Sequence, residues 1–497
     1  MNRINIRIIF WTILLYGLIG AQANAGKIIY PWRAVPAIVK CGNNFSILYD
    51  NERSILIDSV ILEGPYNKII LNIDSVLIGK FEYDPYSHSS TNNEIWVTIP
   101  DSTPEELYDL IIKSGGEVQR SLKSVKVVKE FKPKHSFIHI SDLHVSRQWV
   151  GTPVNGYAKE LELLNGFLKV ANIISPDFIL VTGDNIHNYT RINADATGWG
   201  GTLITDAGSR PLVEEKWRNY FEGANNFLGI NGFNSPVFSV TGNHDFYGVD
   251  ENDHKAKVTQ WNSLCGKRIY GFSYGETRVI AADDFMGDPV TDIPATSPMS
   301  GLQGRFFTSF FNQNGSGLLR IMAQHRHDRI DTSFCNKYKI NILLHGHNHK
   351  PFVESVGITP TLSTRPGAVC RSGVLDTEAE LGFFRLFYID GDKFTYTEPL
   401  RFCKDPTKSY NELDLNLTID FEKPNNGSSD KNKATLNNKL GVDLSDCNIR
   451  FIMKKGKYQV TKGFIFQVIE TNIYSIVDVR ANIPNGKLTD ITISTLK

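Results

Sequence analysis

Hydrophobic and polar residues follow one pattern in the first and last parts of the chain. From about residue 30 to 131, short apolar or alternating runs are separated by clusters of Asn, Gly, Pro and Asp, which is typical of strands and turns. These runs lie at 45–49, 54–62, 94–99 and 125–130. β-Branched and aromatic runs return at 413–421, 449–453, 463–469 and 473–479. Both regions are therefore predicted to be all-β and sandwich-like.

Between these regions, strand and helix patterns alternate. Residues 136–140 and 178–182 are apolar runs typical of buried strands, and residues 158–174 place Leu161, Leu164, Leu168 and Ala171 at helical spacing. Apolar runs at 236–240, 278–282, 318–323 and 340–344 follow, each ending in polar residues. This alternation predicts a layered α/β domain, whose ligands usually lie at the carboxyl ends of the strands.

Length and charge limit the possible classes of function. A chain of 497 residues is expected to hold about three domains, and a composition of 41% hydrophobic and 21% charged residues excludes a disordered chain. Lys plus Arg and Asp plus Glu both number 53, without a long run of one sign. Such a balance gives no electrostatic footprint for nucleic acid, so no nucleic-acid binding is expected.

The first 25 residues have the pattern of a cleavable signal peptide. Arg3 and Arg7 precede an apolar run at 8–19, and residues 23–25 form a small-x-small sequence that ends before Gly26. The apolar run is shorter than the roughly 20 residues that span a bilayer. We therefore expect a secreted, periplasmic or surface-associated protein with no transmembrane segment in the mature chain.

Five of the central segments end in residue types that bind metals. In chain order these are Asp142 and His144, then Asp184, then Asn243, His244 and Asp245, then His325, and finally His347 and His349. Carboxylates neutralise cations, imidazoles add affinity, and an asparagine oxygen donates without adding charge. The chain has only 12 histidines, and five of them stand at these strand ends. Together the segments predict a site for two divalent metal ions.

In this order the motifs read D-x-H, G-D, G-N-H-D, a lone H, and G-H-x-H, from Asp142 to His349. A chain with these motifs resembles the calcineurin-like metallophosphoesterases. The resemblance implies an α/β (α+β) fold with a central four-layer β-sandwich of two mixed sheets flanked by helices. We expect a signal peptide at 1–25, a β domain at 27–131, a catalytic domain at 134–401 and a second β domain at 402–497.

The resemblance also implies a role for each residue. One metal ion would be held by Asp142, His144 and His349, the other by Asn243, His325 and His347, and Asp184 would bridge the two ions. The metals would be manganese, iron, zinc or cobalt, with the identity left open. A water bridging the ions would attack phosphorus. His244, oriented by Asp245, would protonate the leaving oxygen as a general acid.

Some positions around the motifs are open to two interpretations. His327 competes with His325 as a ligand, and we favour His325 because it comes first after its strand. His187 stands where purple acid phosphatases carry an iron-binding tyrosine, which argues against that subclass. We expect His187, His327 and Tyr247 as candidate substrate residues, although His187 could equally be a solvated loop residue. The glycine-rich segment 189–212 is either a lid or, as we favour, a surface insertion.

The leading hypothesis is a secreted phosphoesterase, dependent on two metal ions, that acts on a small-molecule or lipid phosphate ester. Within the enzyme class, the alternative is a phosphodiesterase acting on a cyclic nucleotide or a lipid head group. In a different class, the alternative is a non-catalytic surface binding protein whose β regions recognise a partner. Intact residues in all five motifs argue against this last alternative. The sequence does not indicate an oligomeric state.

Overall fold

The computed structural model describes most of the chain. The described ranges are 26–51, 56–85, 89–145, 158–187, 191–192, 202–203, 206–246, 253–286, 301–315, 317–357, 361–365 and 381–496. The predicted signal peptide, Tyr247 and most of segment 189–212 lie outside them. Within the described ranges, no helix has the length and apolar character needed to cross a membrane.

The first region consists of strands and contains no helix among its described residues. Its strands are β1 (Lys27–Tyr30), β2 (Ala37–Lys40), β3 (Asn44–Asp50), β4 (Ile57–Glu63), β5 (Lys68–Glu82), β6 (Ser90–Thr98), β7 (Leu107–Ser114) and β8 (Glu117–Val128). Hydrogen bonds join them in the order β1-β3-β6-β5-β4-β7-β8-β2. Alternating residues of these strands bury a separate hydrophobic core that includes Ile47, Val60, Ile95 and Val125. All four strands predicted here are present.

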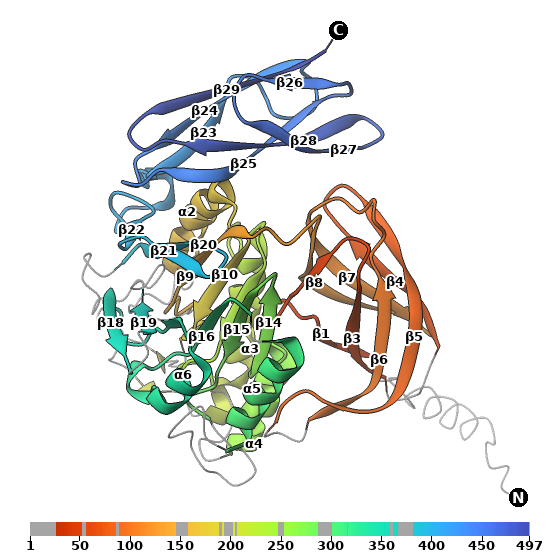
Figure 1. Ribbon diagram of the computed structural model, residues 1–497, viewed down its shortest axis with the longest axis vertical. Helices are drawn as coiled ribbons and strands as arrows, with labels where there is room; N and C mark the ends of the chain where they lie inside the picture. The colour runs from red at the N-terminus through yellow and green to blue at the C-terminus, as the bar shows by residue number, and fades with distance from the viewer. Residues whose placement is uncertain are drawn as a thin grey trace, which may run out of the picture.

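Two mixed sheets form the central region (Figure 1). The first has the order β13-β10-β9-β20-β21, with β22 also paired to β20, and the second has the order β14-β15-β16-β17-β19-β18. The first comprises β9 (Lys134–Ile140), β10 (Phe178–Thr182), β13 (Val237–Val240), β20 (Phe383–Asp390), β21 (Lys393–Tyr396) and β22 (Leu400–Arg401). The second comprises β14 (Tyr270–Tyr274), β15 (Thr277–Ala281), β16 (Leu319–Ala323), β17 (Ile342–Leu344), β18 (Phe352–Val356) and β19 (Thr361–Arg365).

Helices and short pairings lie between these strands. The helices are α2 (Ala158–Ile174), α3 (Asp206–Glu222), α4 (His254–Leu264), α5 (Gly301–Asn314), α6 (Thr332–Tyr338), η2 (Ile230–Gly232) and η3 (His327–Arg329). The short strands β11 (Arg191–Ile192) and β12 (Thr202–Leu203) pair with each other. The predicted helix at 158–174 coincides with α2, whose apolar face joins the core of the first sheet through Leu164 and Phe167. The two mixed sheets and few helices agree with the implied metallophosphoesterase fold.

The last region again consists mainly of strands. These are β23 (Leu417–Phe421), β24 (Lys431–Asn438), β25 (Leu444–Lys454), β26 (Tyr458–Val460), β27 (Phe464–Glu470), β28 (Tyr474–Ile483) and β29 (Leu488–Thr495), preceded by η5 (Tyr410–Glu412). They form a sheet in the order β23-β24-β29-β26 and another in the order β25-β28-β27. Figure 1 shows these strands beyond α2, at the end of the molecule that carries the C-terminus. The proposed boundaries of the three domains stay a prediction.

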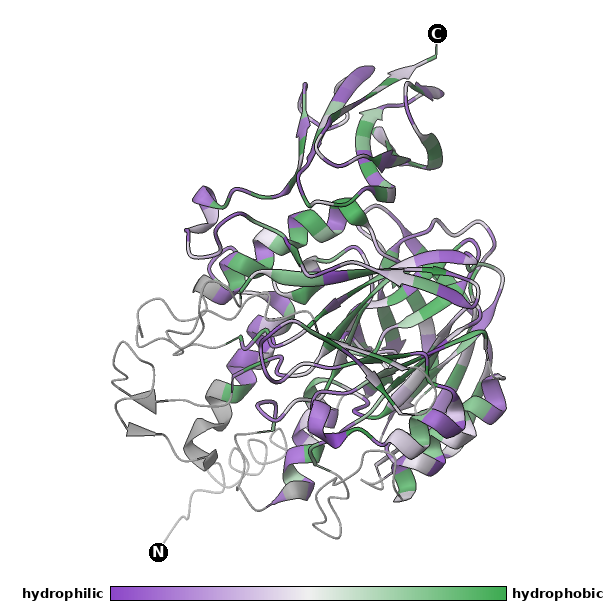
Figure 2. Cartoon of the chain, turned by 60° about the vertical axis from the view of Figure 1, so that its left-hand side comes forward, coloured by the Kyte–Doolittle hydropathy of each residue, from purple (hydrophilic) through white to green (hydrophobic). Residues whose placement is uncertain are grey.

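The direction of the central strands brings the predicted site residues to one edge. β9, β10 and β13 run parallel to one another, and so do β15, β16 and β17. Most of their residues are buried, with Lys134, Ser136 and Arg320 as the exceptions, and hydrophobic residues concentrate on the strands at the centre of the molecule (Figure 2). Because parallel strands end at the same edge of a sheet, the polar segments that follow them meet there.

Candidate metal centre

The residues after the central strands have an unusual backbone. Asp142, His144, Asp184, His347 and His349 all have positive φ, at 56°, 48°, 51°, 78° and 56°. Such a conformation costs about 1–3 kcal/mol for each non-glycine residue and persists only where the surrounding structure imposes it. Strain that collects in three loops at one edge of the sheets marks this edge as a candidate functional site.

The first group of side chains comprises Asp142, His144, Asp184 and His349. Their ligand atoms all lie within 4.8 Å of one another. His144 Nε2 lies 3.2 Å from His349 Nε2 and 3.5 Å from Asp184 Oδ2, and His349 Nε2 lies 3.3 Å from Asp142 Oδ1. Three loops, of which the first and the last are 205 residues apart in the chain, thus supply one compact set of nitrogen and oxygen donors.

The second group comprises Asp184, His325 and His347, again within 4.8 Å of one another. His325 Nε2 lies 3.1 Å from Asp184 Oδ2 and 3.1 Å from Asn243 Oδ1, which adds an amide oxygen to the set. Asp184 therefore belongs to both groups. A carboxylate shared between two donor sets is what a pair of neighbouring cations requires.

The donor spacings fit metal coordination. Ligand atoms about 2.0–2.1 Å from one ion in tetrahedral geometry are separated by about 3.3 Å. The closest donor pairs are 3.1–3.3 Å apart. Two imidazole nitrogens facing each other, such as those of His144 and His349, also share a cation more readily than a single proton. The mixed nitrogen and oxygen set suits manganese, iron, zinc or cobalt.

The electrostatics of the cluster favour positive charge. Burial alone would lower the pKa of His325, but Asp184 and the other nearby carboxylates raise it to about 10. Burial would likewise raise the pKa of Asp184, yet His325 and His244 hold it below its ordinary value. The pKa of His347, in contrast, falls to about 4 because of burial and the neighbouring His325. An unprotonated imidazole of this kind is ready to ligate a cation.

His325 is oriented by two groups that the sequence patterns did not single out. Its Nδ1–H donates to the carbonyl oxygen of Thr182 at 2.7 Å, which leaves Nε2 facing Asp184. Its backbone N–H donates to Asp284 Oδ2 at 3.1 Å, and Arg326 donates its own N–H to the same oxygen. Asp284 comes two residues after the end of the apolar run 278–282. Its place at a strand end, like that of Asp184, was the available signal.

Two glycines allow the loops to approach closely. Gly183 has φ 85°, and a Cβ there would lie 2.5 Å from His325 Nδ1. A Cβ on Gly242 would lie 2.1 Å from the backbone nitrogen of Asp184. Any other residue would push the Asp184 loop away from its neighbours, so the glycines of the G-D and G-N-H-D motifs serve the geometry of the cluster.

Asp245 has a different set of contacts from the one expected. Its Oδ1 accepts the backbone N–H groups of Asn185 and Ile186 at 2.9 and 3.1 Å. Its Oδ2 accepts the Gly242 N–H at 2.8 Å and the Asn185 side-chain amide at 2.9 Å. These bonds fasten the Asp184 loop to the loop of Asn243 and His244. All four of these bonds are to amide groups and not to the His244 ring. The orientation of His244 by Asp245 stays a prediction.

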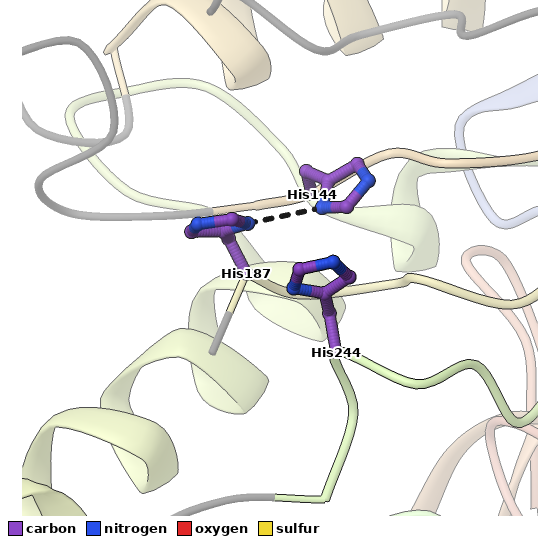
Figure 3. Close-up of side chains that lie close together, drawn as sticks. All are labelled: His144, His187 and His244. Carbon is purple, nitrogen blue, oxygen red and sulfur yellow. Dashed lines mark hydrogen bonds between the residues drawn. The ribbon is translucent and has the colours of Figure 1, made fainter. Parts of the chain in front are cut away.

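His244 lies at the open side of the cluster. Its side chain is 21% exposed, and its Nε2 lies 4.0 Å from Asp184 Oδ2, while its backbone N–H donates to Asp184 Oδ1 at 2.9 Å. Its ring packs against those of His144 and His187 (Figure 3). His244 is thus close enough to the cluster to meet a bound substrate without belonging to either donor set.

The three candidate substrate residues, His327, His187 and Tyr247, lie in different places. His327 lies outside both donor groups and contacts the Asn348 side chain at 3.3 Å, so the structure places His325 rather than His327 in the cluster. His187 is fully buried beside His144. Tyr247 lies outside the described residues. A role of these three in substrate binding stays a prediction.

The central region matches a known family. The sequence model of the calcineurin-like phosphoesterases matches residues 135–351. No curated protein matches the chain.

Solved structures similar to the chain share little sequence with it. A conserved uncharacterized protein of Streptococcus pneumoniae TIGR4, described as a predicted phosphoesterase, is 15% identical, with 53% of this chain and 87% of that chain covered and a TM-score of 0.22. For GAP50 of Plasmodium, described as the anchor in the inner membrane complex, these values are 11%, 56%, 86% and 0.31. For vacuolar protein sorting 29 of Cryptosporidium parvum they are 13%, 53%, 96% and 0.24.

The family match spans the strands and loops that build the cluster. It begins at His135, in β9, and ends at Pro351, two residues after His349. Residues 135–351 are therefore a calcineurin-like phosphoesterase domain.

Proposed function

We propose that this protein hydrolyses a phosphate ester with the help of two divalent metal ions held at the edge of the central sheets. The observation that carries the proposal is the place of Asp184, which belongs to two donor groups at once. Asp142, His144 and His349 would hold one ion, and Asn243, His325 and His347 the other. When bound, such a pair of ions polarises the phosphoryl oxygens and activates water.

The residues of the chain would divide the remaining work. Asp142 and Asp184 would neutralise part of the positive charge of the ions. The buried imidazoles would exclude water from the inner side of the site. His244 is the partly exposed member, so its imidazole can contact the phosphoryl group from the open side. From there it would give a proton to the leaving oxygen, a contribution of about 10²–10⁴-fold in rate.

Hydrolysis of para-nitrophenyl phosphate and bis-para-nitrophenyl phosphate tests this function. We expect turnover of at least one of them with added manganese, and its loss after chelation. The Asp184→Asn variant should lose at least about 10³-fold in kcat, since both ions lose their shared ligand. The His244→Gln variant should keep its metal ions, counted by elemental analysis, and turn over about 10²–10⁴-fold more slowly. The ratio of the two substrates decides between monoesterase and diesterase activity.

A matched control is Asp390→Asn, which changes an exposed carboxylate at the end of β20. Asp390 lies beside the start of β9, whereas the donor residues follow the end of β9, so turnover should stay unchanged. Undiminished turnover by the Asp184→Asn variant, or by chelated wild type, would contradict the proposal. Binding of metal without turnover of either substrate would favour the surface binding protein instead.

A further inference from the structure

His187 packs against the cluster but belongs to neither of the two donor groups that contain Asp184. His187 follows Asp184 by three residues and is fully buried. Its ring stacks on His244, with centroids 4.9 Å apart and planes at 21°, and its Nδ1 lies 3.2 Å from His144 Nδ1 (Figure 3). The imidazoles of His144, His187 and His244 thus face one another from three loops.

Metal binding by His144 would decide which ring is the hydrogen-bond donor in its contact with His187. His144 turns its Nε2 toward Asp184 and His349, at 3.5 and 3.2 Å. If Nε2 ligates a metal ion, its lone pair is used there and the proton of a neutral imidazole sits on Nδ1. That N–H needs an acceptor because His144 is fully buried. The atom 3.2 Å away is His187 Nδ1.

His187 is itself held firmly in place. Its backbone N–H donates to the carbonyl of Val145 at 3.1 Å, next to the bridge between Val145 and Ile186. Its carbonyl accepts a hydrogen bond from Lys216 Nζ of helix α3 at 2.8 Å. The position of the ring is therefore tied to the backbone of the His144 loop and to a helix behind the site.

We infer that His187 is a positioning residue for the metal centre: it accepts the Nδ1–H of His144 and so directs His144 Nε2 toward the ion. Ligating histidines almost always donate their second ring N–H to an acceptor, and loss of that acceptor typically weakens metal binding about 10- to 100-fold. The inference rests on the proposed metal site. It differs from a substrate-contacting role, which a fully buried ring does not favour.

Two variants of His187 isolate the hydrogen bond. His187→Asn places an acceptor oxygen near the position of Nδ1, whereas His187→Leu keeps an apolar side chain of similar bulk and removes the acceptor. We expect His187→Leu to bind manganese about 10- to 100-fold more weakly in competition with a chelator, with two ions still bound at saturation. His187→Asn should stay within about threefold of wild type. The absorption spectrum of the cobalt-loaded Asn variant should match that of wild type.

Each other outcome has a definite meaning. Wild-type affinity in the Leu variant, or equal losses in both variants, would overturn the hydrogen-bond role. Three ions bound to wild type and two to the variants would show that the three imidazoles hold an ion of their own, which would also overturn it. A wild type that binds no metal would instead refute the proposed function. Unfolding of the metal-free variants, followed by circular dichroism, shows whether they fold.

Discussion

The four buried carboxylates of the site act on two kinds of neighbour. Asp142 and Asp184 face histidines, which hold the pKa of both carboxyls below the ordinary value in spite of burial. Asp245 and Asp284 face backbone amides instead, and burial raises their pKa values to about 8 and about 7. The first pair suits cation binding, whereas the second pair fixes the loops on which the cluster stands.

Replacement of Asp245 tests whether a carboxylate that accepts backbone amides stabilises the loops of the site. Asp245→Ala leaves the buried N–H groups of Asn185, Ile186 and Gly242 without their acceptor. Each such loss costs about 1–3 kcal/mol, so we expect the free energy of unfolding to fall by at least about 3 kcal/mol. Denaturant unfolding of the metal-free protein measures it.

The control for Asp245 is Asp331→Ala. Asp331 accepts the Phe334 N–H at the start of α6, outside both donor groups, and its loss should cost about 1 kcal/mol. If Asp245→Ala cost no more than this control, the carboxylate would not be what joins the two loops.

At the scale of elements, the strands that end in the motifs were predictable from the sequence. Their apolar runs are short and continuous, as expected of strands buried on both faces, and β10 and α2 begin and end as predicted. β20 was missed, although it pairs antiparallel with β9 beside the parallel strands. Its run at 383–390 carries Arg385 in the middle, and only the fold shows that this arginine is buried.

The candidate site was predictable to a similar extent, and for a related reason. The donor residues follow their strands directly, so strand direction alone gathers them. The supporting groups leave a weaker signal. Thr182 acts through its backbone carbonyl, which leaves no pattern in the sequence. Asp284 comes after a strand, but its contact is with a loop 41 residues further along the chain, and only the fold shows that contact.

Helix α3 contains a buried lysine, Lys216, which should make the free energy of unfolding depend on pH. Lys216 is fully buried, and this burial lowers its pKa from 10.5 to about 7. Between these values the unfolded chain binds more protons than the folded protein, so stability should rise as pH increases from about 7 toward 10.5. The full gain is about 5 kcal/mol at most.

The Lys216→Met variant should lack this rise. Denaturant unfolding at several pH values between 7 and 10 would measure the difference in stability between variant and wild type, which should shift in favour of wild type as pH increases. Lys134→Met, in which an exposed lysine is replaced, should show a difference that does not change with pH. The same pH dependence in Lys216→Met and wild type would contradict the assignment.

At the scale of the whole molecule, buried polar contacts join the three regions. Gln467 of β27 exchanges hydrogen bonds with the backbone of Glu105, at 3.0 and 2.8 Å, so the first and last regions touch directly. Arg450 of β25 pairs with Glu106 at 2.8 Å. Arg268 binds Asp84 of the first region at 2.6 Å and also pairs with Asp283, next to Asp284. The first region is thus fastened to the central region beside Asp284, which supports His325, and the last region is fastened to the first.

Arg268 is therefore expected to link stability of the whole chain to the metal centre. Its side chain is fully buried between two carboxylates, and removing one partner of a buried ion pair costs about 3–5 kcal/mol. Arg268→Met should lower the free energy of unfolding by this amount and weaken manganese binding, because Asp283 shares its turn with Asp284. Arg120→Met, which breaks an exposed pair on the first sheet, should cost less than about 1 kcal/mol and leave metal affinity unchanged. A loss of stability in Arg268→Met with wild-type metal affinity would show that the first region stabilises the chain without reaching the site.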